Sequence, residues 1–204
     1  MASKPLERVG ERCSRKPIFS IKTWFNRYAN DTLYRLKTFS KLKMDSYYTI
    51  ISADSRTVNI FKEIEKRNNK FYHLLLKNKI QGIFTSPPYV GQIDYHEQHA
   101  YAYDLFEFQR KDELEIGPLY KGKGFEARTA YVEGVSKVLL NCRNFLAKEF
   151  DVFLVANDKY NLYPEIAQQA GMKIINQFRR PVLNRTERDK SPYSETIFHL
   201  KNGK

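Results

Sequence analysis

An apolar run that ends in two prolines is the feature that most limits how this chain can fold. Residues 82–85 have the composition of a buried strand, and Ser86, Pro87, Pro88 and Tyr89 follow directly. Each proline fixes φ near about −65° and removes an N–H group, so the segment is extended and rigid. It presents a hydroxyl, free carbonyls and an aromatic face at the carboxyl end of a strand, which is where open α/β sheets bind ligands.

Segments with strand and helix character alternate along the chain. Apolar spacing predicts helices over 17–42, 57–67, 97–109, 127–148 and 162–170. Runs of β-branched and apolar residues predict strands over 47–56, 82–85, 151–158, 172–180 and 193–201. The segments 68–81 and 110–125 are interpreted as a connector and a loop. This order predicts an α/β sheet that ends in an antiparallel β-pair.

The charge of the chain favours a polyanionic partner. Lysine and arginine number 35 against 23 aspartate and glutamate, which gives a formal net charge of +12. Nucleic acid is the expected partner, and a merely soluble basic surface is the alternative. Residues 1–16 are predicted to form a basic flexible N-terminus, and 17–204 a single domain.

Cysteine content and the length of the apolar runs indicate the cellular compartment. Cys13 and Cys142 are too few for a disulfide framework or a zinc ligand set, which fits a reducing cytoplasm. No signal peptide is visible, and no apolar run approaches membrane-spanning length. His96 and His99 lack a third ligand and the spacing of a zinc helix, so no metal site is predicted.

The run Thr85-Ser86-Pro87-Pro88-Tyr89 resembles the catalytic motif of amino-group DNA methyltransferases, written (D/N/S)-P-P-(Y/F/W). Four flanking sequences extend the resemblance over roughly residues 45–202, namely "ADSR", "DY", "VFLVAND" and "YSETIFHLK". The resemblance implies a Rossmann-like methyltransferase sheet, S-adenosyl-L-methionine as cofactor and double-stranded DNA as substrate. The serine form of the motif favours N4 of cytosine over N6 of adenine, and an RNA substrate is a further alternative.

The chemistry of an exocyclic amine explains the residue types in this motif. Its lone pair is delocalised into the ring, so acceptors at Ser86 and at the carbonyl of Pro87 would help to localise it on nitrogen. The rigidity of Pro87 and Pro88 helps in-line alignment with the methyl group. Tyr89 offers a stacking face for a base flipped out of the duplex, and Tyr95 is expected on the other side of that base. A proline-stiffened loop without chemistry is the alternative.

Two further groups of residues are expected to bind the cofactor and the DNA. The resemblance places Asp54, Ser55 and Thr85 at the cofactor, with Asp54 accepting a hydrogen bond from its adenine amino group. Asp54 as an N-cap of the following helix is a compatible alternative. The basic loop between the last two strands is predicted to contact phosphates, and a solvated basic turn is its alternative. The arginines concerned are Arg179, Arg180, Arg185 and Arg188.

One expected motif is missing. The family holds the methionine end of its cofactor with a Phe-x-Gly-x-Gly turn, and none of the nine glycines makes that pattern. The sequence therefore predicts a catalytic half-domain, with a second polypeptide supplying the glycine turn. The alternatives are a truncated inactive remnant and a non-catalytic basic nucleic-acid-binding protein.

Overall fold

The computed structural model describes residues 6–9, 12–15, 20–182 and 193–203. Its contacts divide the chain into two compact units, residues 1–48 and 49–204. The first unit contains a short antiparallel pair, β1 (Leu6–Val9) and β2 (Arg12–Arg15), and the helix α1 (Ser20–Leu42). The helix confirms the prediction over 17–42 for its described part. The predicted division of the chain at residue 16 stays a prediction.

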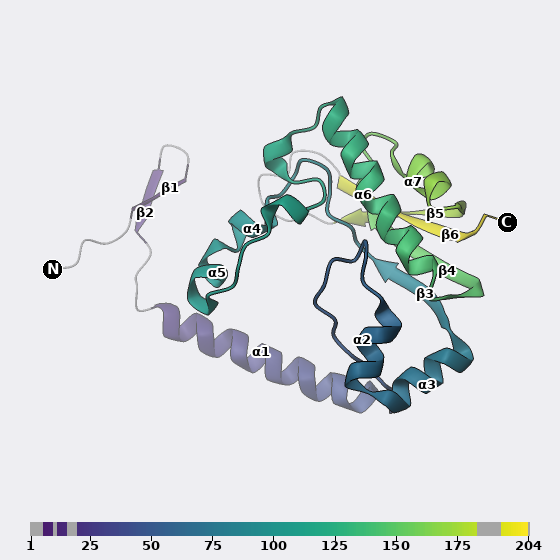
Figure 1. Ribbon diagram of the computed structural model, residues 1–204. Helices are drawn as coiled ribbons and strands as arrows, with labels where there is room; N and C mark the ends of the chain where they lie inside the picture. The colour runs from purple at the N-terminus through teal and green to yellow at the C-terminus, as the bar shows by residue number, and fades with distance from the viewer. Residues whose placement is uncertain (1–5, 10–11, 16–19, 183–192, 204) are drawn as a thin grey trace. The chain divides into compact units, whose positions relative to one another are not determined.

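The second unit is built on a four-stranded mixed sheet (Figure 1). Its strands are β3 (Ile80–Thr85), β4 (Leu146–Ala156), β5 (Met172–Val182) and β6 (Tyr193–Asn202), in the order β3-β4-β6-β5. β3 runs parallel to β4, whereas β4 and β6, and β5 and β6, are antiparallel. The predicted α/β sheet with a C-terminal antiparallel pair is therefore confirmed, and its Rossmann-like methyltransferase character stays a prediction.

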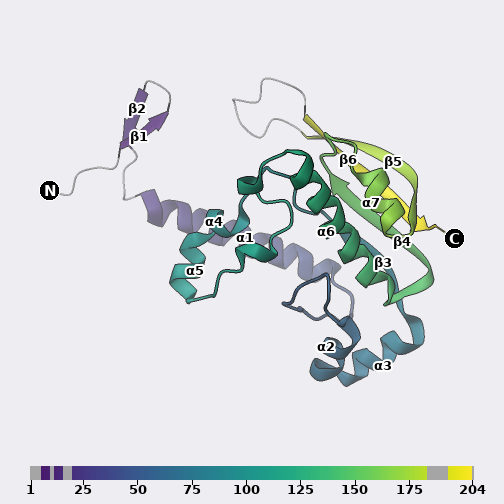
Figure 2. The same ribbon diagram turned by 45° about the horizontal axis from the view of Figure 1, so that its top comes forward.

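Two helices cover one face of this sheet and form the core with it (Figure 2). α6 (Phe125–Arg143) directly precedes β4 in the chain, and α7 (Tyr163–Gln169) connects β4 to β5. The core side chains from these elements and from Ala170 after α7 are Tyr131, Val132, Val135, Leu139, Leu146, Phe150, Val152, Leu154, Ala156, Tyr163, Ile166, Ala167, Ala170, Met172, Phe198 and Leu200. Gly171, with φ of +63°, ends α7 at the predicted C-cap glycine.

The remaining helices are short. α2 (Ile60–Arg67) and α3 (Asn69–Asn78) precede β3, and α4 (Tyr95–Gln98) and α5 (Ala100–Phe106) follow it. Two 3₁₀ turns, Asp112–Leu114 and Leu119–Lys121, lie within the loop predicted over 110–125. Among the described residues, no helix is both long enough and apolar enough to cross a membrane.

Asparagine caps explain two errors in the predicted helices. The segment 68–81, predicted as a connector, contains α3, because the side chain of Asn68 accepts a hydrogen bond from Phe71 N at 2.9 Å. Asn59 caps α2 in the same way, so that helix begins at residue 60 and not at 57. Asparagine accepts from the free N–H groups of a first turn, and here it begins helices instead of interrupting them.

The strand predicted over 47–56 is wrong. Residues 43–59 form no strand, and Tyr48 and Ile50 are exposed. Apolar and β-branched composition favours a strand only where cross-strand neighbours pack against it, and here no neighbouring strand does so. Two predicted boundaries were also wrong. The helix predicted over 127–148 ends at 143, and the following strand begins at 146 and not at 151.

Candidate active site

The predicted catalytic segment, Ser86–Tyr89, begins where β3 ends and is held at both ends. Thr85, the last residue of β3, pairs with Leu154 of β4. The Ser86 hydroxyl donates a hydrogen bond to the carbonyl of Val155 at 3.0 Å. The Tyr89 hydroxyl donates to the carboxylate of Glu195 on β6 at 2.7 Å. The segment is therefore tied to two different strands of the sheet.

The bond to Val155 decides what Ser86 can offer a ligand. A hydroxyl has one donor hydrogen and two acceptor lone pairs. Since the hydrogen points at the Val155 carbonyl, the lone pairs of Oγ remain to accept hydrogen bonds from another group. Ser86 is exposed, so its oxygen is accessible. The hydroxyl is thus oriented as an acceptor.

A glycine turn fixes the chain after Tyr89. Gly91 has φ of +61°, and its N–H donates to the carbonyl of Gly117 at 2.9 Å. A Cβ atom at this position would lie 2.5 Å from the carbonyl oxygen of Gly122, so any side chain would collide with the loop. The loop predicted over 110–125 therefore packs directly behind the catalytic segment.

A small cavity lies beside the segment and gathers several of the predicted residues. Its volume is about 170 Å³. The lining residues are Ser55, Thr85, Ser86, Pro87, Pro88, Ile116, Val135, Val138, Leu139 and Leu154. The structure thus brings the predicted cofactor residues Ser55 and Thr85 together with three members of the catalytic segment. The rest of the lining from α6 and β4 is apolar, namely Val135, Val138, Leu139 and Leu154.

Asp54 lies in a turn and not at the end of a strand, so the structural premise of its prediction was wrong. Its carboxylate accepts from the Arg56 backbone N–H at 3.0 Å and from Arg56 Nη2 at 2.8 Å. The hydrogen bond from the Arg56 side chain, followed by that from its backbone, lowers the pKa of Asp54. The alternative as an N-cap of α2 is also wrong, because Asn59 holds that position. A role for Asp54 at the adenine of the cofactor stays a prediction.

A second cavity adjoins Asp54. Its volume is about 330 Å³, and it shares Ser55 and Ile116 with the cavity beside Ser86. The other lining residues are Ser52, Ala53, Asp54, His96, Lys111, Leu114 and Glu115. Ser55 and Ile116 therefore line both cavities, with Ser86 lining the first and Asp54 the second.

Where the structure describes them, the predicted substrate-binding residues do not line the two cavities above. Tyr95 begins α4, its backbone N–H donates to Glu115 Oε1 at 2.7 Å, and it lines neither cavity. Arg179 Nε donates to Ser194 Oγ at 2.9 Å, which spans the β5–β6 pair. Arg180 forms an ion pair with Glu195. Arg185 and Arg188 lie outside the described residues.

Glu195 is the residue of the site that sequence reasoning missed. It is 5% exposed, and among the described residues it and Ser136 are the buried polar or charged side chains. A lone carboxylate in the run "YSETIFHLK" was the available signal, since a charge next to core residues of a strand needs a partner. That partner, Tyr89, is 106 residues away in sequence.

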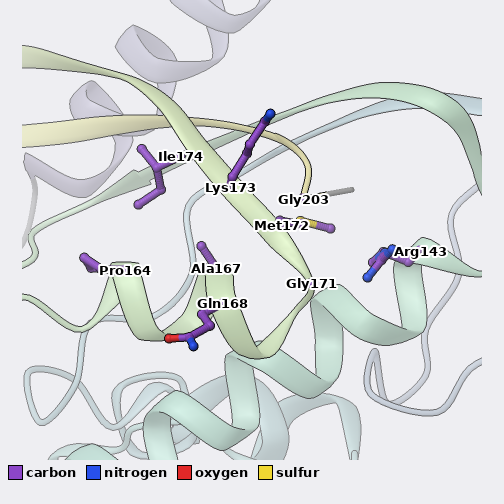
Figure 3. Close-up of a pocket in the computed structure, with 9 residues that line it drawn as sticks. All are labelled: Arg143, Pro164, Ala167, Gln168, Gly171, Met172, Lys173, Ile174 and Gly203. Carbon is purple, nitrogen blue, oxygen red and sulfur yellow. The ribbon is translucent and has the colours of Figure 1, made fainter.

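A larger hollow lies away from all of these residues, near the C-terminal end of α7 (Figure 3). Its volume is about 440 Å³. Arg143 lies at one side of it and donates to the carbonyl of Ala170 at 3.0 Å and to Asn202 Oδ1 at 3.4 Å. A guanidinium that binds the last carbonyls of a helix is a C-terminal cap. We therefore interpret Arg143 as structural.

Comparison with known proteins gives one strong relative. No protein-family model matches the chain. The Type II methyltransferase M.MjaII of Methanocaldococcus jannaschii is 54% identical over 186 residues, or 91% of this chain. The chain spans 35% of the length of that relative. Among solved structures, the M1.HpyAVI–SAM complex is 11% identical over 70% of this chain and 52% of its own, with a TM-score of 0.33.

Proposed function

We propose that this chain is the catalytic component of a DNA methyltransferase that acts on the exocyclic amino group of a flipped base, with N4 of cytosine favoured over N6 of adenine. The observation that carries the proposal is the Ser86–Tyr89 segment, which is held at the carboxyl end of β3 beside a cavity. The Type II methyltransferase that shares 54% identity supports it. Incubation of duplex DNA with the chain together with a polypeptide that carries the Phe-x-Gly-x-Gly turn, followed by mass spectrometry of the nucleosides, tests it; the absence of any methylated base from that mixture would contradict it.

The chemistry assigned to the segment follows from the acceptor geometry. S-adenosylmethionine, when bound, supplies the electrophilic methyl group. The Ser86 hydroxyl oxygen and the Pro87 carbonyl accept hydrogen bonds from the amino group of the base, which concentrates the lone pair on nitrogen. As positive charge develops on that nitrogen, both hydrogen bonds strengthen, so they stabilise the transition state more than the ground state. The Tyr89 ring stacks on the flipped base and holds it in line.

The cavity at Ser86 fits only part of a cofactor. Its 170 Å³ is below the about 300 Å³ at which pockets for drug-sized ligands begin. The hydroxyls of Ser55 and Thr85 can hydrogen-bond the cofactor, but the sequence has no Phe-x-Gly-x-Gly turn to approach it closely. We infer that a second polypeptide with a Phe-x-Gly-x-Gly turn completes the site.

The outer edge of β3 is the surface we assign to that polypeptide. β3 is the terminal strand of the sheet order, and its sequence, Ile-Gln-Gly-Ile-Phe-Thr, carries no charge. Unpaired, uncharged edge strands are templates for a further strand. Phe84 projects on the face opposite α6 and is 79% exposed. A strand added parallel to β3 would extend the sheet and bring the glycine turn to the carboxyl end of β3.

Replacing Phe84 with lysine should prevent assembly with the second polypeptide without unfolding the chain. A charge on an edge strand opposes strand pairing, and an exposed side chain contributes little to the core. Analytical ultracentrifugation of the mixture measures complex formation. Phe125→Lys is the matched control, since Phe125 is 78% exposed at the start of α6. Equal assembly of both variants would move the docking surface away from β3.

DNA binding should depend strongly on salt. The formal charge of +12 predicts several phosphate contacts, and reversing Arg185 and Arg188 to glutamate should remove those of the basic loop. Each lost contact lowers the slope of log K against log salt by about one unit. Fluorescence anisotropy with duplex DNA over a range of salt concentrations measures the slope. Lys77→Glu in α3 is the control, and an unchanged slope in the arginine variant would place the DNA elsewhere.

A further inference from the structure

We propose that Glu195 is a positioning residue for methyl transfer, which fixes the Tyr89 ring for the flipped base and connects it to the basic β5–β6 pair through Arg180. The inference rests on the proposed function of the Ser86–Tyr89 segment. It adds a carboxylate on β6 to a site otherwise built at the ends of β3 and β4.

The carboxylate of Glu195 contacts both Tyr89 and Arg180. One carboxylate oxygen accepts the hydrogen of the Tyr89 hydroxyl at 2.7 Å. The other lies 3.5 Å from Nη1 of Arg180, which is the direct neighbour of Glu195 in the β5–β6 register. Tyr89, Glu195 and Arg180 thus form a continuous polar connection from the catalytic segment to β5.

A buried carboxylate at this point needs an explanation other than stability. Moving a charge out of water is costly, and a buried ion pair is often no more stabilising than apolar residues of similar volume. Glu195 is 5% exposed, whereas the side chain of Arg180 is 59% exposed. The carboxylate instead positions the Tyr89 side chain, because a short hydrogen bond to it specifies where the tyrosine hydroxyl must lie.

The Tyr89 side chain is consequently fixed at both of its ends. At the backbone, the rigid Pro88 precedes Tyr89, and the carbonyl of Tyr89 accepts a hydrogen bond from Gln92 N at 3.2 Å. At the hydroxyl, Glu195 holds it. With both ends held, the ring cannot change its χ1 rotamer without breaking the bond to Glu195. A flipped base therefore meets a ring that is already in place, and the entropy of ordering it is not lost at each turnover.

Three single variants in the assembled enzyme, Glu195→Gln, Glu195→Ala and Tyr89→Phe, and the double variant Tyr89→Phe/Glu195→Ala test this role. The glutamine keeps an acceptor for the tyrosine hydroxyl and should retain most of kcat. The alanine should lower kcat on the order of 10²-fold with little change in KM for DNA, because the ring is then misplaced. Tyr89→Phe combined with Glu195→Ala should be no slower than the slower of the two single variants. Full activity of Glu195→Ala, or effects that simply multiply, would overturn the proposal.

Urea unfolding of the full chain gives a second readout that needs no activity. If Tyr89 and Glu195 are bonded, the midpoint shift of Tyr89→Phe/Glu195→Ala should be smaller than the two single shifts added together, because each single variant already removes the hydrogen bond. Tyr101→Phe, at an exposed position of α5, is the control and should add independently. Additive shifts would overturn the positioning role. The proposed function fails separately. If the shifts are non-additive but the assembled wild-type enzyme methylates neither DNA nor RNA, the bond between Tyr89 and Glu195 stands and the proposed function is contradicted.

Discussion

Ser86→Ala and Tyr89→Ala should each abolish most methyl transfer by the assembled enzyme while the chain stays folded. Ser86→Ala removes an acceptor whose lone pairs are left accessible by the bond to Val155. Loss of one aligned electrostatic contact to the transition state costs on the order of 10²-fold or more in rate. Tyr89→Ala removes the stacking face and the bond to Glu195 together. Transfer of labelled methyl groups to duplex DNA measures both effects.

Matched controls separate chemistry from folding in this experiment. Ser40→Ala lies in α1, and Tyr101→Ala removes a tyrosine that is 69% exposed. Both should keep the wild-type rate. Circular dichroism should show that Ser86→Ala is folded like these controls, and its urea midpoint should fall by no more than the loss of one hydrogen bond to Val155, about 1 kcal/mol, accounts for. Near-normal rates for folded Ser86→Ala and Tyr89→Ala would show that the site assignment is wrong.

The isolated chain should bind S-adenosylmethionine weakly, with little or no turnover, and become active when a Phe-x-Gly-x-Gly polypeptide is added. The physical reason is the missing Phe-x-Gly-x-Gly turn, whose backbone would approach the cofactor closely. Calorimetric titration of the cofactor into the chain, the second polypeptide and the mixture measures the difference. Micromolar binding by the chain alone would contradict the inferred division of the site.

Two sources of the second polypeptide can be compared. One is the product of a neighbouring reading frame. The other is the part of M.MjaII outside the matched region, since this chain spans 35% of that relative. Replacing the first glycine of the turn by valine gives the control, which should assemble but fail to bind cofactor. A truncated inactive remnant predicts poor solubility alone and no activity with either polypeptide.

The features readable from the sequence were those set by local pattern. The strand that ends at Thr85 and the terminal pair β5–β6 have apolar runs bounded by clear turn signals, and both are confirmed. The position of Ser86 and Tyr89 at a strand end followed from the same reading. Gly171 was predicted to end the helix as its C-cap because a left-handed conformation favours glycine; in the structure it has that conformation and directly follows the C-cap residue Ala170.

The features that could not be read depend on partners distant in the sequence. The run 47–56 has the composition of a strand, yet no neighbouring strand pairs with it, so Asp54 lies in a turn bound to Arg56. The bond from Tyr89 to Glu195 joins residues 106 positions apart, and no spacing rule predicts it. Asn68 was misread because asparagine favours both loops and helix N-caps.

The most direct test of the proposed function is methyl transfer from tritiated S-adenosylmethionine to duplex DNA. The assay compares this chain, the Phe-x-Gly-x-Gly polypeptide and the mixture of the two, with digestion to nucleosides to identify the product. We predict N4-methylcytosine from the mixture and little or none from either polypeptide alone. Loss of the product with Ser86→Ala in the mixture would assign the chemistry to this chain. Full turnover by the chain alone, or a stable complex that methylates no base, would contradict the proposed division of the active site.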